Sequence, residues 1–332
     1  MKPEVKDLKG KKVLITGGLG FIGSNLAHKC VELGADVTIF DCLDPRSGGN
    51  HYNVQSIAKS LQFAYQNILD FDQVSQVVTG QDIIFNCASS TSHSFSMREP
   101  WIDTDVNSKG VINLLEAIKR FNPDVKFVHL GTSTQLGKLF FQPADEGHPE
   151  FPSDIYSANK SVSEKYALIY SKAFNIRSTV IRLSNVFGPR ASIHSPEFTF
   201  NNYFIGLALQ GKNITVYGEG SQMRNVLYVN DAISALVLAA QSDKSDREVF
   251  FAVGDDHFSV AEIAEATVKH LGSGKVSFVE WPSGKKALDV GDAILSNKKI
   301  KECLGWFPEN NLKSGLVQTN AYYENCLDQY IR

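Results

Sequence analysis

A glycine-rich turn near the start of the chain constrains the fold more than any other feature. The apolar run Lys12–Thr16 leads directly into Gly17–Gly23 (GGLGFIG), and a helical pattern follows. Glycines at positions 17, 20 and 23 allow a tight turn, close approach of the backbone to a pyrophosphate, and close helix–strand packing. The helix N-terminus offers free N–H groups to phosphates. The turn therefore predicts a dinucleotide-binding unit, although the same spacing also occurs in ordinary glycine-rich turns.

An acidic residue ends the second predicted strand. That strand, Asp36–Asp41, finishes where dinucleotide-binding folds hold the adenosine ribose. The carboxylate of Asp41 could accept hydrogen bonds from both ribose hydroxyls and would repel a 2′-phosphate. This position favours NAD over NADP, and the alternative is a solvated strand end.

Apolar strands alternate with helical segments through the first half of the chain. Further strands are expected at 61–67, 82–88 and 125–131, with helices near 71–79 and 106–121. This alternation predicts an α/β fold of the Rossmann type, a doubly wound parallel sheet covered on both faces. After about residue 185 the pattern loosens, with helices expected at 200–210, 230–241, 260–271 and 312–327. We expect residues 1–180 to form mainly the NAD-binding domain and 181–332 a smaller mixed α/β substrate lobe, with parts of 181–250 returning to the sheet.

Composition excludes several classes of protein. With 332 residues, 43% of them hydrophobic, and a net charge of −3, the chain is neither disordered nor a broadly basic nucleic-acid binder. The five cysteines are scattered without a CxxC pair, which predicts reduced thiols and neither a disulfide framework nor a metal site. The charged N-terminus and the lack of a long apolar stretch predict a cytoplasmic protein that has no membrane partner.

A tyrosine and a lysine lie four residues apart and so share one face of a helix. These are Tyr156 and Lys160. A phenol is ordinarily a poor base because its pKa is about 10, but a nearby ammonium and a cationic cofactor would favour the phenolate. Tyr156 could then move a sugar hydroxyl proton while hydride is transferred, with Lys160 reaching the nicotinamide ribose. Thr132 follows the strand at 125–131 and could bind the reacting oxygen; it could equally cap its own loop.

Together these motifs resemble the extended short-chain dehydrogenase/reductase family, in particular its NAD-dependent nucleotide-sugar epimerase/dehydratase branch. The resemblance covers nearly the whole chain. Besides the glycine turn and the Thr–Tyr–Lys set, it rests on FNCAS at 85–89, Asn107–Gly110, RLSNVFGPR at 182–190, the segment at 217–232 and LGWFP at 304–308.

The resemblance implies an enzyme of carbohydrate biosynthesis that removes hydride from a sugar carbon, most often C4. Its catalytic residues would be Thr132, Tyr156 and Lys160. The residues expected to bind NAD are Gly17, Gly20, Phe21, Ile22, Gly23, Asp41, Asn67, Ile68, Cys87, Ala88, Ser89, Asn107 and Lys160. Those expected to bind a nucleotide-diphosphate sugar are Thr91, His93, Thr132, Ser133, Tyr156, Asn185, Asn201, Val216 and Arg224. The resemblance also implies a homodimer formed through the helices at 106–121 and 156–174.

The residues after Thr132 bear on which reaction follows hydride removal. The 4,6-dehydratases of the family have Asp-Glu there, and the decarboxylases have a Glu at the second position; this chain has Ser133 and Thr134. Without those carboxylates, the simplest chemistry is 4-epimerisation, closest to that of UDP-sugar 4-epimerases. A 4-dehydrogenase, a ketoreductase, a dehydratase-like enzyme and a non-catalytic NAD-binding regulatory protein remain as alternatives.

Some positions depart from the family pattern. Asn67 stands where an Asp often reads the adenine. Asp289 replaces an Arg that often grips the diphosphate, so Lys285 or Lys286 would substitute for it or the nucleotide would sit differently. His93 lies in an unusually polar loop, where it could be a second acid–base group, a hydroxyl contact or an ordinary loop residue.

Overall fold

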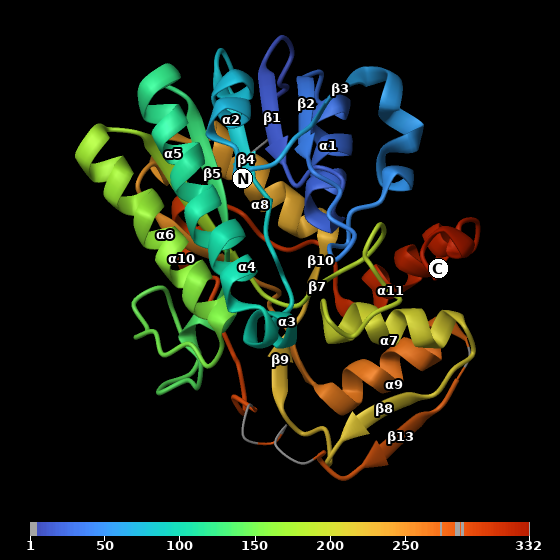
Figure 1. Cartoon of the computed structure of the whole chain (residues 1–332). Helices are drawn as coiled ribbons and strands as arrows, with labels where there is room; N and C mark the ends of the chain where they lie inside the picture. Colours follow the sequence, from blue (N-terminus) through green and yellow to red (C-terminus); the bar gives the residue numbers. More distant parts are fainter. Residues whose placement is uncertain (1–4, 273, 283–285, 287–288, 332) are drawn as a thin grey trace.

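A seven-stranded parallel sheet forms the centre of the molecule (Figure 1). The computed structural model describes residues 5–272, 274–282, 286 and 289–331. The strand order is β11-β6-β5-β4-β1-β2-β3. The strands are β1 (Lys12–Thr16), β2 (Asp36–Asp41), β3 (Leu61–Tyr65), β4 (Ile83–Asn86), β5 (Lys126–Thr132), β6 (Arg177–Leu183) and β11 (Val249–Ala252).

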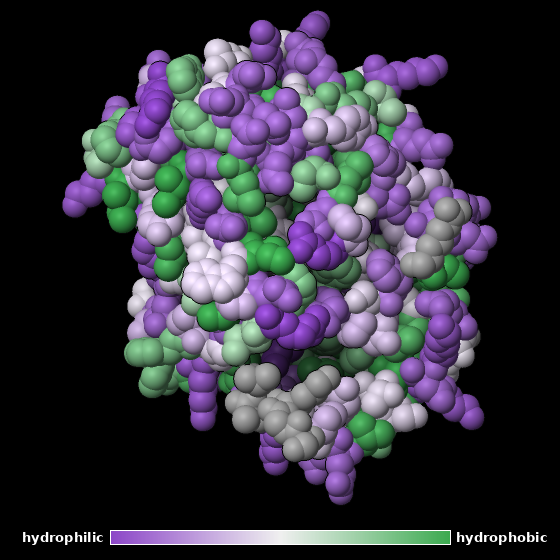
Figure 2. All heavy atoms as spheres, in the orientation of Figure 1, coloured by the Kyte–Doolittle hydropathy of each residue, from purple (hydrophilic) through white to green (hydrophobic). Residues whose placement is uncertain are grey.

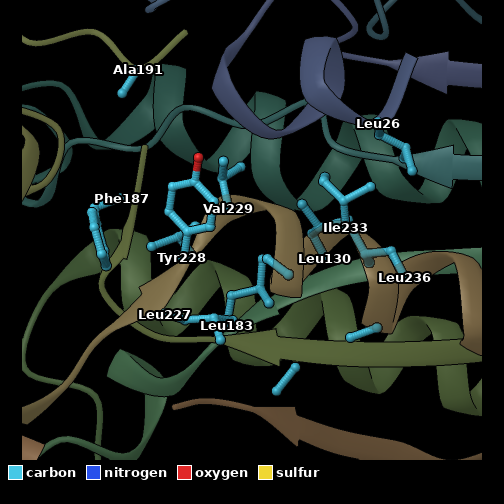
Figure 3. Packing of buried hydrophobic residues seen from close by; sticks show 14 of the residues in the cluster. Leu26, Leu130, Leu183, Phe187, Ala191, Leu227, Tyr228, Val229, Ile233 and Leu236 are labelled. Carbon is cyan, nitrogen blue, oxygen red and sulfur yellow. The ribbon is translucent and has the colours of Figure 1, made fainter. Parts of the chain in front are cut away.

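Helices cover both faces of this sheet because its strands are apolar on both sides. Helices α1 (Phe21–Glu32) and α8 (Val229–Gln241) pack together on one face, and α2 (Phe71–Val78), α5 (Gly110–Phe121) and α6 (Ile155–Phe174) lie on the other. In β1, Val13 and Ile15 join the first layer and Leu14 joins the second. Figure 3 shows the first layer, where Leu26, Ile233 and Leu236 pack near strand residues. The predicted doubly wound α/β fold is confirmed.

The topology reverses the strand order at β1 and β4, in the middle of the sheet. The chain crosses from β3, at one edge, to β4, which pairs with β1 on the side away from β2. In doubly wound sheets, ligands bind at the point where strand order reverses. That point is the gap between β1 and β4, where the glycine turn begins.

The chain after β6 builds a smaller lobe and also completes the sheet. The lobe contains a parallel pair, β8 (Ile214–Tyr217) with β13 (Val276–Val279), packed against α7 (Phe200–Leu209) and α9 (Val260–Leu271). Two short pairs join it to the sheet domain: β7 (Val186–Phe187) with β10 (Leu227–Tyr228), and β9 (Met223–Asn225) with β12 (His257–Ser259). Helix α11 (Leu312–Tyr323) packs on α9 and stops four residues before the predicted end at 327.

Short helices account for most of what the sequence pattern missed. They are η1 (His51–Ser60), α3 (His93–Arg98), α4 (Pro100–Thr104), η2 (Asp105–Lys109), η3 (Ser133–Leu136), η4 (Asp243–Ser245), α10 (Lys298–Leu304) and η6 (Leu327–Gln329). Helix η1 is fixed by long-range contacts: the Asn53 amide donates to the Leu19 carbonyl, and the Tyr330 hydroxyl donates to Asn53. Such elements carry too few periodic residues to be read from sequence.

The visible surface is mainly polar, with apolar residues scattered across it (Figure 2). In the part of the chain that the structure describes, no helix has the length and apolar character needed to span a membrane.

Candidate functional site

The glycine turn is packed so tightly that a side chain would clash at Gly17 and at Gly23. Gly17 has φ +65°, and a Cβ there would lie 2.7 Å from the Ala88 nitrogen. A Cβ on Gly23 would lie 2.2 Å from the Gly17 carbonyl oxygen. Helix α1 begins after Gly20, where no side chain caps its N–H groups. This open, positively polarised helix end over a Cβ-free cradle fits a pyrophosphate.

Asp41 lies beside this cradle at the end of β2 and is partly buried. Its carboxylate accepts hydrogen bonds from the backbone N–H groups of Leu19, at 3.0 Å, and Leu43, at 2.8 Å. Asp41 therefore also holds the glycine turn in place, which the sequence did not reveal. Each carboxylate oxygen can accept more than one hydrogen bond, so the residue still fits a ribose diol.

The remaining residues predicted to bind the cofactor gather around the ends of β3 and β4. Asn107 accepts hydrogen bonds from the Ser89 hydroxyl (2.7 Å) and the Ser90 N–H (3.1 Å), and its amide donates to the Ser90 carbonyl (2.8 Å). Its side chain therefore shapes the loop after β4. Asn67 also stabilises its own loop, because its side-chain oxygen accepts a hydrogen bond from the Leu69 N–H at 3.0 Å. Burial raises the pKa of the Cys87 thiol, which therefore stays protonated at neutral pH.

The Thr–Tyr–Lys set comes together between β5 and α6. Thr132 ends β5, Tyr156 lies in the first turn of α6, and their side chains are hydrogen-bonded. Tyr156 is only 9% exposed. Burial raises its pKa, and the Thr132 hydrogen bond partly opposes this effect. The phenol is thus desolvated and needs help from charge or hydrogen bonds to ionise.

Lys160 lies one helical turn after Tyr156 and is 4% exposed. Its ammonium donates a hydrogen bond to the Leu130 carbonyl of β5. Burial lowers its pKa to about 8, and the attraction of the Glu164 carboxylate only partly offsets this effect. At neutral pH the site therefore still contains a buried positive charge on the face of α6 that carries Tyr156.

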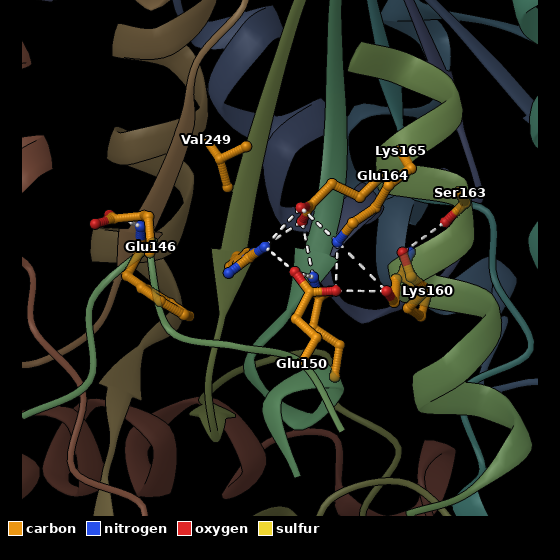
Figure 4. A network of polar contacts seen from close by, with 12 residues as sticks. Glu146, Glu150, Lys160, Ser163, Glu164, Lys165 and Val249 are labelled. Carbon is orange, nitrogen blue, oxygen red and sulfur yellow. Dashed lines mark hydrogen bonds and ion pairs between the residues drawn. The ribbon is translucent and has the colours of Figure 1, made fainter. Parts of the chain in front are cut away.

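A buried ionic network anchors α6 below this site (Figure 4). Arg182 of β6 donates to Glu164 of α6 through Nε (2.8 Å) and Nη2 (2.6 Å), and Nη2 also contacts Glu150 at 2.6 Å. The Arg182 and Glu164 side chains are 3% and 2% exposed. A buried ion pair offsets its desolvation cost only when its hydrogen bonds are well formed. The network therefore fixes the position of α6, the helix that presents Tyr156 and Lys160.

A string of hydroxyls lies beside the tyrosine. The Thr132 and Thr134 hydroxyls are 3.1 Å apart, and the Ser157 hydroxyl contacts Thr134 at 2.9 Å and Asp154 at 3.1 Å. Asp154 also caps α6 by accepting from the Ser157 N–H. Sequence reasoning missed Asp154 and Ser157, although an Asp just before the predicted Tyr–Lys helix is an N-cap signal.

His93 joins the same cluster from α3. Its Nδ1 lies 2.8 Å from an Asp154 carboxylate oxygen. Its ring packs at 79° against the Tyr156 ring, with 4.9 Å between the ring centroids. Burial alone would raise the pKa of Asp154, but His93 and Ser157 more than offset it, so this pKa lies below its usual value. Predicted as a loop residue with several alternatives, His93 is in fact in contact with the candidate base.

The second lobe brings Arg224 to β9, but its guanidinium is already engaged. Arg224 donates to the carbonyls of Met223 (2.8 Å) and Gly291 (2.6 Å), and it lies 3.7 Å from the Asp289 carboxylate. Burial lowers the pKa of Arg224, and the attraction of Asp289 partly opposes that shift. Asp289 therefore neutralises the cation predicted to bind the diphosphate. Of the two lysines suggested as replacements for the missing Arg, Lys285 lies outside the described residues and Lys286 is exposed.

The other residues predicted to bind substrate differ in accessibility. The Asn201 amide donates to the Asn185 carbonyl (2.8 Å), and the Asn185 amide donates to the Asn225 carbonyl (3.0 Å), so both position backbone. Thr91 is exposed, and Ser133 starts η3. Val216 is 1% exposed because β8 packs into the core of the lobe. Its side chain is therefore unavailable, and the predicted substrate contact at this position would come from the backbone.

Comparisons with known proteins agree with this geometry. A family model described as the NAD dependent epimerase/dehydratase family matches residues 13–254. UDP-glucuronic acid decarboxylase 1 of Xenopus tropicalis is 31% identical over 335 residues, covering 98% of this chain and 76% of that protein. UDP-glucose 4-epimerase of Mycolicibacterium smegmatis is 28% identical over 323 residues, covering 95% and 99%. The structure of Thermus thermophilus UDP-glucose 4-epimerase in complex with NAD matches with a TM-score of 0.84 and 26% identity, covering 95% and 99% of the two chains.

Proposed function

We propose a reaction for this chain on the premise that it belongs to the NAD-dependent epimerase/dehydratase family. NAD is its cofactor, and the Cβ-free cradle, the uncapped start of α1 and Asp41 fit it. We infer that the chain is a nucleotide-sugar 4-epimerase. The reaction removes hydride from C4, forms a 4-keto sugar and returns hydride to the opposite face.

NAD, when bound, supplies the hydride acceptor and donor. The residues of the chain handle the proton and the oxygen. In this proposal Tyr156, as phenolate, accepts the C4 hydroxyl proton, and Thr132 hydrogen-bonds the oxygen that becomes the ketone. The buried ammonium of Lys160 favours the phenolate through its charge, and it remains mostly protonated at pH 7 because its pKa is about 8.

One observation carries the choice of epimerisation: the side chains that follow Thr132 are hydroxyls. Ser133 and Thr134 form η3, and the Thr134 hydroxyl is hydrogen-bonded to Thr132 and Ser157. Elimination of water across C5 and C6 needs an acid that protonates the departing C6 hydroxyl group, and a serine or threonine hydroxyl is too weak an acid for this. Hydride removal and return need only the cofactor, Thr132, Tyr156 and Lys160.

Product analysis tests this reaction. The purified protein is incubated, without added cofactor, with UDP-, GDP-, dTDP- and CDP-hexoses, and the products are followed by NMR. We expect one nucleotide class to yield a mixture of two C4 epimers. Absence of an epimer with all of these substrates would refute the proposal, and stoichiometric consumption of NADH would indicate a ketoreductase. A decarboxylase, as in one similar protein, would release a pentose.

We further propose a homodimer formed through α5 and α6. Apolar side chains stand exposed on these helices, notably Phe121 (50%), Ile169 (57%) and Phe174 (46%). A second copy packing on this face would bury them, and apolar burial favours association.

Replacement of Lys160 should change how the free energy of unfolding depends on pH, because burial lowers the pKa of this lysine. Between pH 8 and 10.5 the unfolded chain binds a proton at this lysine that the folded chain does not, so stability rises with pH. The free energy of unfolding of wild type minus that of Lys160→Met should therefore increase by about 3 kcal/mol across this range. Urea titrations at several pH values measure it.

A matched substitution on the same helix separates this effect from general loss of charge. Lys172 is exposed near the end of α6, so Lys172→Met should produce no such rise. If the free energy of unfolding of wild type minus that of Lys160→Met did not change with pH, the amine of Lys160 would not be desolvated.

Removal of the charge of Asp289 should strengthen substrate binding. Asp289→Asn leaves Arg224 with one anion fewer at 3.7 Å, and such a partly buried charge contributes about 1 kcal/mol. The expected result is a KM for the nucleotide sugar lower by about fivefold with kcat unchanged, because the effect lies in ground-state binding. Steady-state kinetics measure this change. Asp255→Asn is the control, because Asp255 pairs with Lys301 and not with Arg224. An unchanged KM would place the diphosphate away from Arg224.

A further inference from the structure

The pairing of His93 with Asp154 fixes the chemistry of the imidazole ring. The Asp154 carboxylate accepts from the Ser157 N–H at 2.8 Å and faces Nδ1 of His93 at 2.8 Å. An ionised carboxylate offers only acceptors, so Nδ1 carries the hydrogen. In the neutral ring Nε2 is then the free base, and the carboxylate fixes the orientation of the ring.

This base lies in contact with the reacting tyrosine and still reaches water. The ring centroids of His93 and Tyr156 are 4.9 Å apart. The His93 side chain is 43% exposed, whereas that of Asp154 is 13% exposed. A proton held by His93 can therefore exchange with solvent, which the buried Tyr156 phenol cannot readily do.

The tyrosine and the histidine pair belong to one hydrogen-bonded cluster. From Tyr156 it runs through the hydroxyls of Thr132, Thr134 and Ser157 to Asp154. Hydroxyl groups beside Tyr156 can donate hydrogen bonds to a substrate oxygen that gains negative charge during the reaction. Simple transfer of hydride at C4 needs one base, and Tyr156 supplies it. A second base in contact with Tyr156 requires a separate explanation.

We propose that His93, positioned by Asp154, abstracts the acidic proton from the carbon next to the ketone, at C3 or C5 of the 4-keto sugar. This inference rests on the proposed function, which generates the ketone. It gives the site a second activity, enolisation, beyond the transfer of hydride. His93 would be a catalytic residue and Asp154 a positioning residue.

The step balances without any further reactant. The C–H bond breaks and its proton forms an N–H bond at Nε2, which makes His93 an imidazolium paired with the Asp154 carboxylate. The electron pair of the C–H bond forms the enolate, with its negative charge on the C4 oxygen, where Thr132 and Tyr156 can donate hydrogen bonds. Return of a proton from Nε2 to carbon restores the ketone. Because His93 is exposed, that proton can come from water.

Asp154 contacts the His93 ring directly, and Glu197 accepts hydrogen bonds from the serines on either side of His93 and pairs with Arg98 of α3. Enolisation requires the neutral ring. Its rate should therefore fall as the pH drops and His93 becomes protonated.

Deuterium exchange tests the proposal. The NAD-loaded protein is incubated in D₂O with UDP-4-keto-6-deoxyglucose, a preformed ketone, and NMR follows deuterium at C3 and C5. We expect incorporation at one of these carbons. His93→Gln, which has no base, should slow it by about 100-fold or more, whereas His270→Gln, far away on α9, should not. Catalysed exchange that is absent in wild type, or that persists in His93→Gln, would overturn the proposal.

A second variant tests the role of Asp154 without removing the helix cap. Asp154→Asn can still accept from the Ser157 N–H, because Asn caps helices as well as Asp does. In Asp154→Asn the fall of the exchange rate at low pH (the acid limb) should occur at lower pH than in wild type, because the imidazolium loses its counter-charge. An unchanged limb would exclude positioning by Asp154. Because the probe is already a ketone, failure to form C4 epimers from nucleotide sugars would refute the proposed function and leave this test intact.

Discussion

Replacement of Tyr156 with Phe is expected to lower kcat by about 10²–10⁴-fold, because the reaction loses its proton acceptor at the C4 oxygen. The ring stays packed against His93, so the site keeps its shape. Only the hydroxyl bonded to Thr132 is lost, which should cost about 1 kcal/mol of stability. Steady-state assays of C4 epimer formation, together with urea unfolding, measure both effects.

Tyr170→Phe is the matched control, because it also removes a hydroxyl from α6, one bonded to Glu116 at 2.7 Å. We expect it to leave kcat within about twofold of wild type. Equal activity of Tyr156→Phe and wild type would contradict the assignment of the base. It would favour a non-catalytic NAD-binding protein.

Introduction of a methyl group at Gly23 should abolish tight binding of NAD. A Cβ would lie 2.2 Å from the Gly17 carbonyl oxygen and 2.8 Å from the Gly18 Cα, both of them backbone atoms that cannot rotate away. The turn must therefore shift away from the start of α1, where we expect the pyrophosphate to bind. We expect Gly23→Ala to weaken NAD binding by about 100-fold or more, because a preorganised site is lost. Calorimetry on protein stripped of cofactor measures this loss.

Gly147→Ala controls for the general effect of adding a methyl group. Gly147 lies in an exposed loop, where a Cβ would come no closer than 3.3 Å, to the Asp145 side chain. Its affinity for NAD should equal that of wild type. Unchanged NAD binding by Gly23→Ala would mean that the cradle does not hold the cofactor.

The cofactor side of the site could be predicted from sequence because local rules govern it. The glycine turn needs backbone that tolerates no Cβ, and only glycine meets this need. Asp41 was expected to bind the ribose because it ends the second strand, where dinucleotide-binding folds place an acidic residue. Tyr156 and Lys160 share a face through helical periodicity alone.

The proton-handling and substrate sides could not be predicted because they depend on long-range packing. His93 and Asp154 lie 61 residues apart in the chain and meet only because α3 packs against α6. The sequence shows that Asp289 replaces an Arg of the family, but its proximity to the Arg224 guanidinium, at 3.7 Å, depends on the folding of two distant segments. The burial of Val216 follows from the pairing of β8 with β13, which periodicity does not report.

The central claim, that hydride leaves C4 and returns to the same carbon, is tested most directly with a nucleotide sugar carrying deuterium at C4. We expect both C4 epimers to form in ordinary water with the deuterium retained at C4, because carbon-bound hydrogen moved as hydride does not exchange with solvent. Loss of the C4 deuterium to water during epimerisation, or a product without a C4 hydroxyl group, would contradict the account.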